Sequence, residues 1–289
     1  MINSNYSLVG EVTITVKNED GSVASLKKYN TITNYMKSSL AKWLSGTPNS
    51  GVGAVLPPTQ IGAGNGSPPF GINGTLPTDT ALWSAISGTQ RNCDSIQVSQ
   101  GYYAQYNLAY QTTDPAGFYN ELGLFDSNNN LWAHVSINQY KSSSQTLTVQ
   151  WMVYMVADTS NSSAVITNYM RSTFAKWMTG TSNVSGQSGA IVPPNKFQLG
   201  TGTGNVQVTD TALWNATVGT SKTCDFITII QSYNVQFAVT YQIADPNGNY
   251  TEVGWIDASG NLWLHGSINA NKTNGLLLSV IGQVGILGN

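Results

Sequence analysis

The chain of 289 residues carries a formal net charge of −2, with 9% charged and 40% hydrophobic residues, including 14 Tyr, 8 Trp and 7 Phe. This length allows two domains of ordinary size, each with its own core, and so many aromatic side chains argue against a disordered chain. The weak charge without a basic run argues against nucleic acid as the main partner, and no apolar run reaches the ~20 residues of a membrane span.

The N-terminal stretch, residues 1–30, predicts a β-hairpin extension. Residues 6–17 alternate between apolar and polar side chains as a strand does, a turn follows, and residues 22–29 return as a second strand. The stretch has no second copy of equal length, so we expect it to pack against a neighbour or to cap the first domain. Residues 1–5 lack the basic and apolar regions of a secretory signal.

The rest of the chain is a tandem repeat. Residues 31–157 and residues 164–289 share the same segments in the same order, which predicts two β-domains. A short polar linker, residues 157–163, marks the boundary between them.

Each repeat opens on one short amphipathic helix, over residues 35–44 and residues 169–178. In the first helix, Thr33 or Asn34 can cap the N-terminus, and apolar side chains at positions 36, 40, 43 and 44 share one face. Gly46 suits a left-handed end of this helix.

Two connections follow each helix. The first is a Pro- and Gly-rich loop, residues 56–66 and 192–204, whose Gly-x-Gly-x-Gly pattern lacks the Lys-Ser/Thr and the βαβ context of a phosphate cradle. The second is a Leu-Trp turn, residues 78–83 and 209–214. We expect Asp or Thr to cap a brief helical turn there, and the Leu-Trp pair to anchor in the core.

Alternating strands complete each repeat and set the fold class. They are predicted at residues 95–98, 102–110 and 146–156, and again at residues 226–230, 234–241 and 276–286. Together with the hairpins described next, they predict an all-β, mainly antiparallel fold of two tandem β-sandwich or barrel-like domains. The domains either stack or lie side by side about a pseudo-twofold axis.

Two cysteines, Cys93 and Cys224, lie at equivalent positions in the two repeats. One small buried thiol per domain is favoured over a disulfide between domains. Two cysteines cannot form a zinc site unaided.

The clearest repeated feature is a β-hairpin with an Asn- and Gly-rich turn. Its residues return at one constant spacing, and we expect them to form a structural motif without a catalytic, cofactor-binding or metal-binding role. In chain order they are Glu121, Gly123, Asp126, Trp132 and His134, then Glu252, Gly254, Asp257, Trp263 and His265.

Within this motif, each polar residue has a structural and a chemical interpretation. Glu121 lies between apolar neighbours, which favours a carboxylate that accepts hydrogen bonds from backbone amides over a glycosidase carboxylate. His134 is expected on a strand, two residues after its Trp, with its imidazole hydrogen-bonded at the strand edge. The alternative for His134 is a metal ligand that meets its copies on the axis of a symmetric oligomer.

The order of the segments resembles the N-terminal and collar-type domains of bacteriophage tail-fibre proteins. The shared features are an Ile-Thr-Asn helix start, a Gly-x-Gly loop, a Leu-anchored turn, a Glu-x-Gly-x-x-Asp strand and an Asn-Leu turn, and they cover residues 31–156 and 165–286. Duplication within one chain, without a long fibrous or receptor-binding region, departs from the tail-fibre pattern. This favours a compact tail, collar, spike or capsid-surface protein. The polar, weakly charged composition is also similar to virion proteins of viruses that infect thermophilic archaea.

We therefore expect a non-enzymatic virion structural protein, without a cofactor, that contacts copies of itself and other virion proteins. It would belong to an extracellular particle assembled in the host cytoplasm. A carbohydrate-binding or host-adhesion module is the alternative, in which exposed aromatic side chains stack on a surface glycan; the candidates are Tyr102, Tyr103, Tyr106, Tyr233 and Trp263. A hydrolase that uses Glu121 or Glu252 is the third hypothesis.

Overall fold

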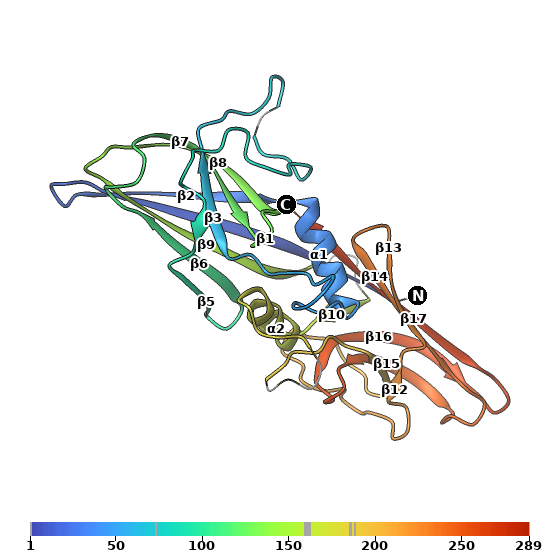
Figure 1. The fold of residues 1–289 in the computed structure, drawn as a ribbon. Helices are drawn as coiled ribbons and strands as arrows, with labels where there is room; N and C mark the ends of the chain where they lie inside the picture. Colours follow the sequence, from blue (N-terminus) through green and yellow to red (C-terminus); the bar gives the residue numbers. More distant parts are fainter. Residues whose placement is uncertain (1, 73, 159–162, 185–186, 188, 289) are drawn as a thin grey trace.

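The computed structural model describes residues 2–72, 74–158, 163–184, 187 and 189–288 (Figure 1). These residues form a mainly antiparallel β-structure with two helices, which confirms the predicted all-β class with one short helix per repeat. Most of the predicted linker, residues 159–162, lies outside the described residues.

The elements follow the same order in both repeats. The first repeat and the hairpin before it contain β1 (Ile2–Lys17), β2 (Val23–Ile32), α1 (Asn34–Leu44), β3 (Gln60–Gly64), β4 (Arg91–Asn92), β5 (Ser95–Ser99), β6 (Tyr103–Tyr110), β7 (Gly117–Phe125), β8 (Leu131–Lys141) and β9 (Thr146–Asp158). The second contains β10 (Ala164–Ile166), α2 (Asn168–Met178), β11 (Lys196–Gly200), β12 (Lys222–Thr223), β13 (Phe226–Ile230), β14 (Asn234–Tyr241), β15 (Gly248–Ile256), β16 (Leu262–Lys272) and β17 (Leu278–Gly288).

Both helices begin and end where their sequences indicate. The Thr33 hydroxyl accepts the backbone N–H of Met36 at 3.2 Å, so Thr33, not Asn34, is the N-cap of α1. Thr167 caps α2 in the same way. Gly46 and Gly180 follow the helices with φ of +97°, a conformation in which a residue with a Cβ is strained.

Strand β1 lies at the centre of a twelve-stranded sheet that contains strands of both repeats (Figure 1). It pairs antiparallel with β9 along one edge. On its other edge, the segment from Ile2 to Leu8 pairs parallel with β17, and the segment from Gly10 to Lys17 pairs with β2. The hairpin predicted at residues 1–30 is therefore present, but its first strand belongs to both repeats and does not simply cap the first one.

One large hydrophobic core runs through both repeats, so the expectation of a separate core in each domain is wrong. The helices are the reason: α1 packs against β14 and β17 of the second repeat, and α2 packs against β6 and β9 of the first. A second sheet, β10-β16-β15-β11-β12, belongs to the second repeat alone.

Reciprocal contacts relate the repeats by a pseudo-twofold axis. The rings of Trp43 and Trp177 stack at 4.8 Å between centroids. Trp43 also packs on Trp263 of the second repeat, and Trp177 packs on Trp132 of the first. Trp132 and Trp263 occupy equivalent positions in the two repeats, so the contacts between the repeats are reciprocal. Such reciprocity is the mark of the isologous interface of a C2 dimer.

The axis passes through the sheet near Ser7. This residue of β1 pairs with Val156 of β9 on one side and with Leu287 of β17 on the other, and these two residues occupy equivalent positions in the repeats. Of the two arrangements left open by the sequence, the side-by-side one about a pseudo-twofold axis is therefore present.

Two predicted connections differ from the structure. The Gly-rich loops contain the short strands β3 and β11, which pair with β7 and β15. The Leu-Trp segments contain turns and no helical turn. Asp79 accepts the backbone N–H of Leu76 in one such turn, but its side chain also reaches into the hairpin, which a capping role does not explain.

Candidate functional site

The carboxylate of Glu121, on β7, is the centre of the repeated motif. Its side chain is fully buried, and it accepts the backbone N–H groups of Gly66 at 3.2 Å, of Trp83 at 2.8 Å and of Ser84 at 2.8 Å. These amides belong to the loop after β3 and to the Leu-Trp turn, so one carboxylate ties two connections to the hairpin. The predicted hydrogen bonding of Glu121 to backbone amides is confirmed.

Glycines leave the space that this carboxylate occupies. A Cβ atom at Gly64 or Gly66 would collide with Oε1 of Glu121, and a Cβ at Gly200 or Gly202 would collide with Oε1 of Glu252. The Gly-x-Gly pattern therefore allows a carboxylate of the same chain to approach the backbone closely.

His134 lies between two carboxylates. Its Nδ1 is 2.8 Å from Oδ2 of Asp79, and its Nε2 is 2.8 Å from Oε2 of Glu121. The imidazole is fully buried, and the Trp83 ring covers it at 4.7 Å between centroids. An imidazolium donates to both carboxylates, whereas a neutral imidazole has a single N–H donor.

The second repeat contains the same arrangement, which we call the Asp-His-Glu network in both copies. Nδ1 of His265 is 2.6 Å from Oδ2 of Asp210, and its Nε2 is 3.0 Å from Oε2 of Glu252. Trp214 covers this imidazole at 4.5 Å. Glu252 again accepts three backbone N–H groups, from residues 202, 214 and 215.

Hydrogen bonds keep both glutamates ionised despite burial. Burial raises the pKa of Glu121, but the hydrogen bonds from His134 and from the amides of Ser84 and Trp83 outweigh it, and the pKa lies below its ordinary value of 4.5. The pKa of Glu252 is lowered against the same effect of burial, mainly by its backbone amide donors and then by His265. Both carboxylates therefore act as hydrogen-bond acceptors and not as proton donors.

Asp126 joins the hairpin turn to the helix. Its Oδ2 accepts the Tyr35 hydroxyl of α1 at 3.1 Å and the Trp132 indole N–H at 3.2 Å, while its Oδ1 accepts the backbone N–H of Asn130 at 3.0 Å. Asp257 repeats these contacts with the corresponding residues Tyr169, Trp263 and Asn261. A Cβ at Gly123 would collide with Phe125 and Leu131, and one at Gly254 with Leu262.

One sequence expectation for the hairpin is wrong, and two alternatives that the sequence left open conflict with the structure. His134 is not at a strand edge, because it pairs with Gly123 on one side and with Thr31 on the other. Both ring nitrogens are engaged within its own repeat, which conflicts with a metal site on an oligomer axis. Tyr106 and Trp263 are fully buried and cannot stack on a glycan.

The sequence did not reveal that Asp79 and His134 pair, or that Trp83 covers the imidazole. The signal available was the spacing between these residues, which is the same in the second repeat for Asp210, Trp214 and His265. Spacing alone does not show contact between segments so far apart in the chain.

The described residues contain no metal-binding group and no activated thiol. In the part of the chain that the structure describes, no group of three or more His, Cys, Asp or Glu side chains could hold a metal ion. Cys93 and Cys224 are free thiols and half-buried, less buried than predicted. Burial raises the pKa of each to about 12, so neither is an activated thiolate at neutral pH. No described helix is long and apolar enough to cross a membrane.

Comparison with models of protein families, with curated proteins and with solved structures gave no match to this chain.

Proposed function

We propose that this chain is a non-enzymatic structural protein of a virus particle, in a tail, collar, spike or capsid surface, that works by contacts with copies of itself and with other virion proteins. The resemblance of its segment order to tail-fibre domains supports the viral part of the proposal. The protein would be part of an extracellular particle assembled in the host cytoplasm, and it needs no cofactor for this role.

The main support for a structural role is how the two Asp-His-Glu networks use their polar groups. In each copy the imidazole and the glutamate are fully buried, and each has its hydrogen-bond partners within the same repeat. Two equal, internally satisfied networks hold loops and hairpins together, whereas a reaction centre needs a group that can reach a substrate.

Exposed apolar side chains on the surface support the proposal that the chain assembles with copies of itself and with other proteins. Apolar side chains lie exposed where the two repeats differ in sequence: Phe118 is 58% exposed and Tyr140 is 49% exposed, and their places in the second repeat are taken by Asn249 and Asn271. Few charges are present to oppose close approach of subunits, and exposed apolar groups of this kind favour protein contacts.

Two measurements test this function. Light scattering of the purified chain over a range of concentrations should show oligomers, and they should persist in 1 M salt because ion pairs contribute little to the contacts. Electron microscopy with an antibody against the chain should label virus particles. A chain that stays monomeric at every concentration and labels no particle would contradict the proposal.

A glycan-binding role is the second candidate, and one feature favours it. Phe118 and Tyr140 are cross-strand partners with ring centroids 5.2 Å apart, which forms an exposed aromatic pair on β7 and β8. Sugars stack on such rings. Saturable binding on a glycan array, lost in Phe118→Ala but kept in Phe226→Ala, would favour adhesion over a purely structural role; Phe226 is 49% exposed elsewhere on the surface.

A further inference from the structure

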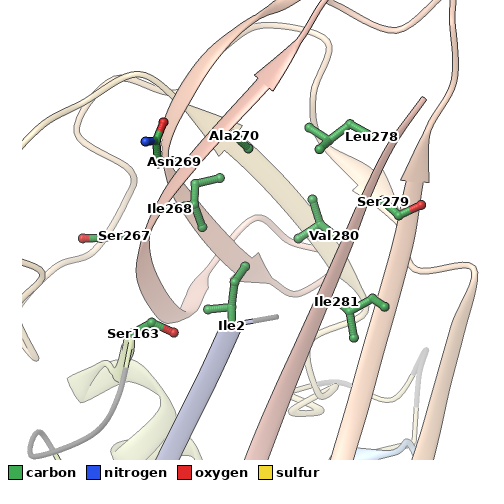
Figure 2. A pocket seen from close by; sticks show the side chains of 10 residues that line it. All are labelled: Ile2, Ser163, Ser267, Ile268, Asn269, Ala270, Leu278, Ser279, Val280 and Ile281. Atoms are coloured by element: carbon green, nitrogen blue, oxygen red, sulfur yellow. The ribbon is translucent and has the colours of Figure 1, made fainter. Parts of the chain in front are cut away.

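A groove in the second repeat separates the free edge of β17 from β16 (Figure 2). Its volume is about 240 Å³. Ile2 lies at its base, between Ile268 of β16 and Val280 of β17. Strand β1 starts to pair with β17 at Ile2 and Gly282, so within the described residues the segment from Leu278 to Ile281 has no partner strand on this edge.

The equivalent space in the first repeat is filled by this chain itself. There, Ile14 and Val16 of β1 pair with Val149 and Leu147 of β9. Leu147 is fully buried there, whereas its counterpart Leu278 is only partly buried; Val149 and its counterpart Val280 are both buried. The pseudo-twofold axis through Ser7 explains the difference, because β1 extends further along β9 than along β17.

The sequence around the groove is more apolar than its filled counterpart. Leu276 and Leu277 are each 57% exposed, whereas the first repeat has Gln145 and Thr146 at these positions. Gln145 donates a hydrogen bond to Asn18 in the turn of the β1–β2 hairpin. Leucines at the open site therefore indicate a covering partner of apolar character, since exposed neighbouring leucines are costly in water.

Charge distinguishes this edge from the open edge of β2. Along β2, Lys27 and Lys28 lie beside the unpaired edge, and lysines there oppose pairing with another chain. The segment from Leu276 to Ile281 contains no charged residue. The chain's own hairpin turn lies at the opposite end of the molecule and cannot reach the groove (Figure 1).

We propose that the groove is the contact through which two copies of this chain associate, with the β17 segments of both copies paired antiparallel about a twofold axis at Ser279. This inference rests on the self-assembly proposed above and names its interface. Antiparallel pairing is the arrangement that β1 and β9 adopt in the first repeat. Centred on Ser279, it places Leu278 of one copy opposite Val280 of the other, so both free edges are satisfied by one closed contact.

A single cysteine tests this geometry directly. A residue on the twofold axis of an antiparallel pair faces its own copy, with Cβ atoms about 4.5–5.5 Å apart, which is close to what a disulfide requires. Ser279→Cys should give a covalent dimer as the main species under mild oxidation on a non-reducing gel. The matched control is Thr148→Cys, which is exposed at the equivalent place in β9 but pairs with Thr15 of β1.

A second pair of variants tests the apolar part of the contact. Leu276→Lys with Leu277→Lys replaces apolar side chains at the contact by ammonium groups that would lose water on association, and it should weaken self-association at least ~100-fold, as measured by analytical ultracentrifugation. The control is Val218→Lys with Phe70→Lys, which adds the same charge at two fully exposed sites. All variants should keep the circular dichroism spectrum of the unmodified chain, because the replaced side chains are exposed.

The outcomes separate this inference from the proposed function. If the unmodified chain is oligomeric but Ser279→Cys forms no more dimer than Thr148→Cys, the interface is elsewhere, and self-assembly stands. The inference is equally overturned if the leucine variants associate as the controls do. If the unmodified chain is monomeric throughout, self-assembly through this groove and elsewhere fails together.

Discussion

At the scale of single residues, Glu121 and Glu252 hold the connections of their repeats in place. Each is a buried carboxylate with three backbone N–H donors and one imidazole partner. Charged hydrogen bonds are stronger than neutral ones, and a partner left unpaired after burial is costly.

Replacing Glu121 by Gln should lower the free energy of unfolding by ~3 kcal/mol, because the amide keeps the shape but removes the charge that His134 and the backbone donors face. Glu252→Gln should cost a similar amount. Urea unfolding followed by fluorescence measures both. Glu19→Gln, at an exposed turn position, is the control and should change stability by less than ~0.5 kcal/mol; an equally small loss in Glu121→Gln would show that the network is not structural.

The lowered pKa values of Glu121 and Glu252 also predict a loss of stability in acid. The unfolded chain binds protons at these two carboxylates near pH 4.5, whereas the folded chain binds them only at lower pH. The contribution of the two carboxylates to the free energy of unfolding is therefore complete above about pH 4.5 and is lost as the pH falls through their folded-state pKa values. The unfolding temperature should therefore decrease from pH 6 to pH 3. In Glu252→Gln this decrease should be smaller; an unchanged slope would contradict the assignment.

The sequence predicted that Glu121 binds backbone amides because a lone carboxylate among apolar residues has few other ways to be satisfied. It did not predict the pairing of Asp79 with His134, because that contact joins a turn to a distant strand and depends on the packing of both. Local patterns carry information about a residue's own element, and much less about which other element it meets.

At the scale of elements, the two helices connect the repeats. Trp43 of α1 and Trp177 of α2 stack on each other, and each also packs on a tryptophan of the opposite repeat. Both rings are fully buried.

Trp43→Ala and Trp177→Ala should each reduce the free energy of unfolding by ~3–5 kcal/mol, because a large buried ring leaves a cavity. The double variant should lose less than the sum, since the two rings share one contact. Chemical denaturation of the three variants measures this coupling. Strict additivity would mean that the stacked pair contributes nothing beyond the two separate sites.

The helices, the hairpins and the last strand of each repeat could be predicted, because their apolar residues recur at the period of a helix or a strand. Strands β3 and β11 could not, since glycines needed for the approach of Glu121 and Glu252 give these segments the composition of a loop. The packing of each helix against strands of both repeats was also hidden. An apolar helix face shows that the helix is covered, but not by which strand.

At the scale of the whole molecule, the repeats behave as two subunits of a dimer joined in one chain. They share one core, and β1 pairs with the last strand of each. A single repeat would therefore expose the surface that its partner's helix covers.

Neither half should fold alone. Residues 1–158 and residues 163–289, produced separately, should each lack dispersed amide signals in NMR spectra, because each loses the helix that completes its part of the core. Mixing them should restore the spectrum of the intact chain. A folded, stable second half by itself would show that the shared core is not required.

The parallel pairing of β1 with β17 has a mechanical consequence. The pairs run from Ile2 with Gly282 to Leu8 with Gly288. The start of β1, at Ile2, and the end of β17, at Gly288, therefore lie at opposite ends of the paired region. A force that pulls these ends apart loads all the connecting hydrogen bonds together in shear and does not peel them open one after another. A protein held at both ends by its neighbours would resist tension at this seam.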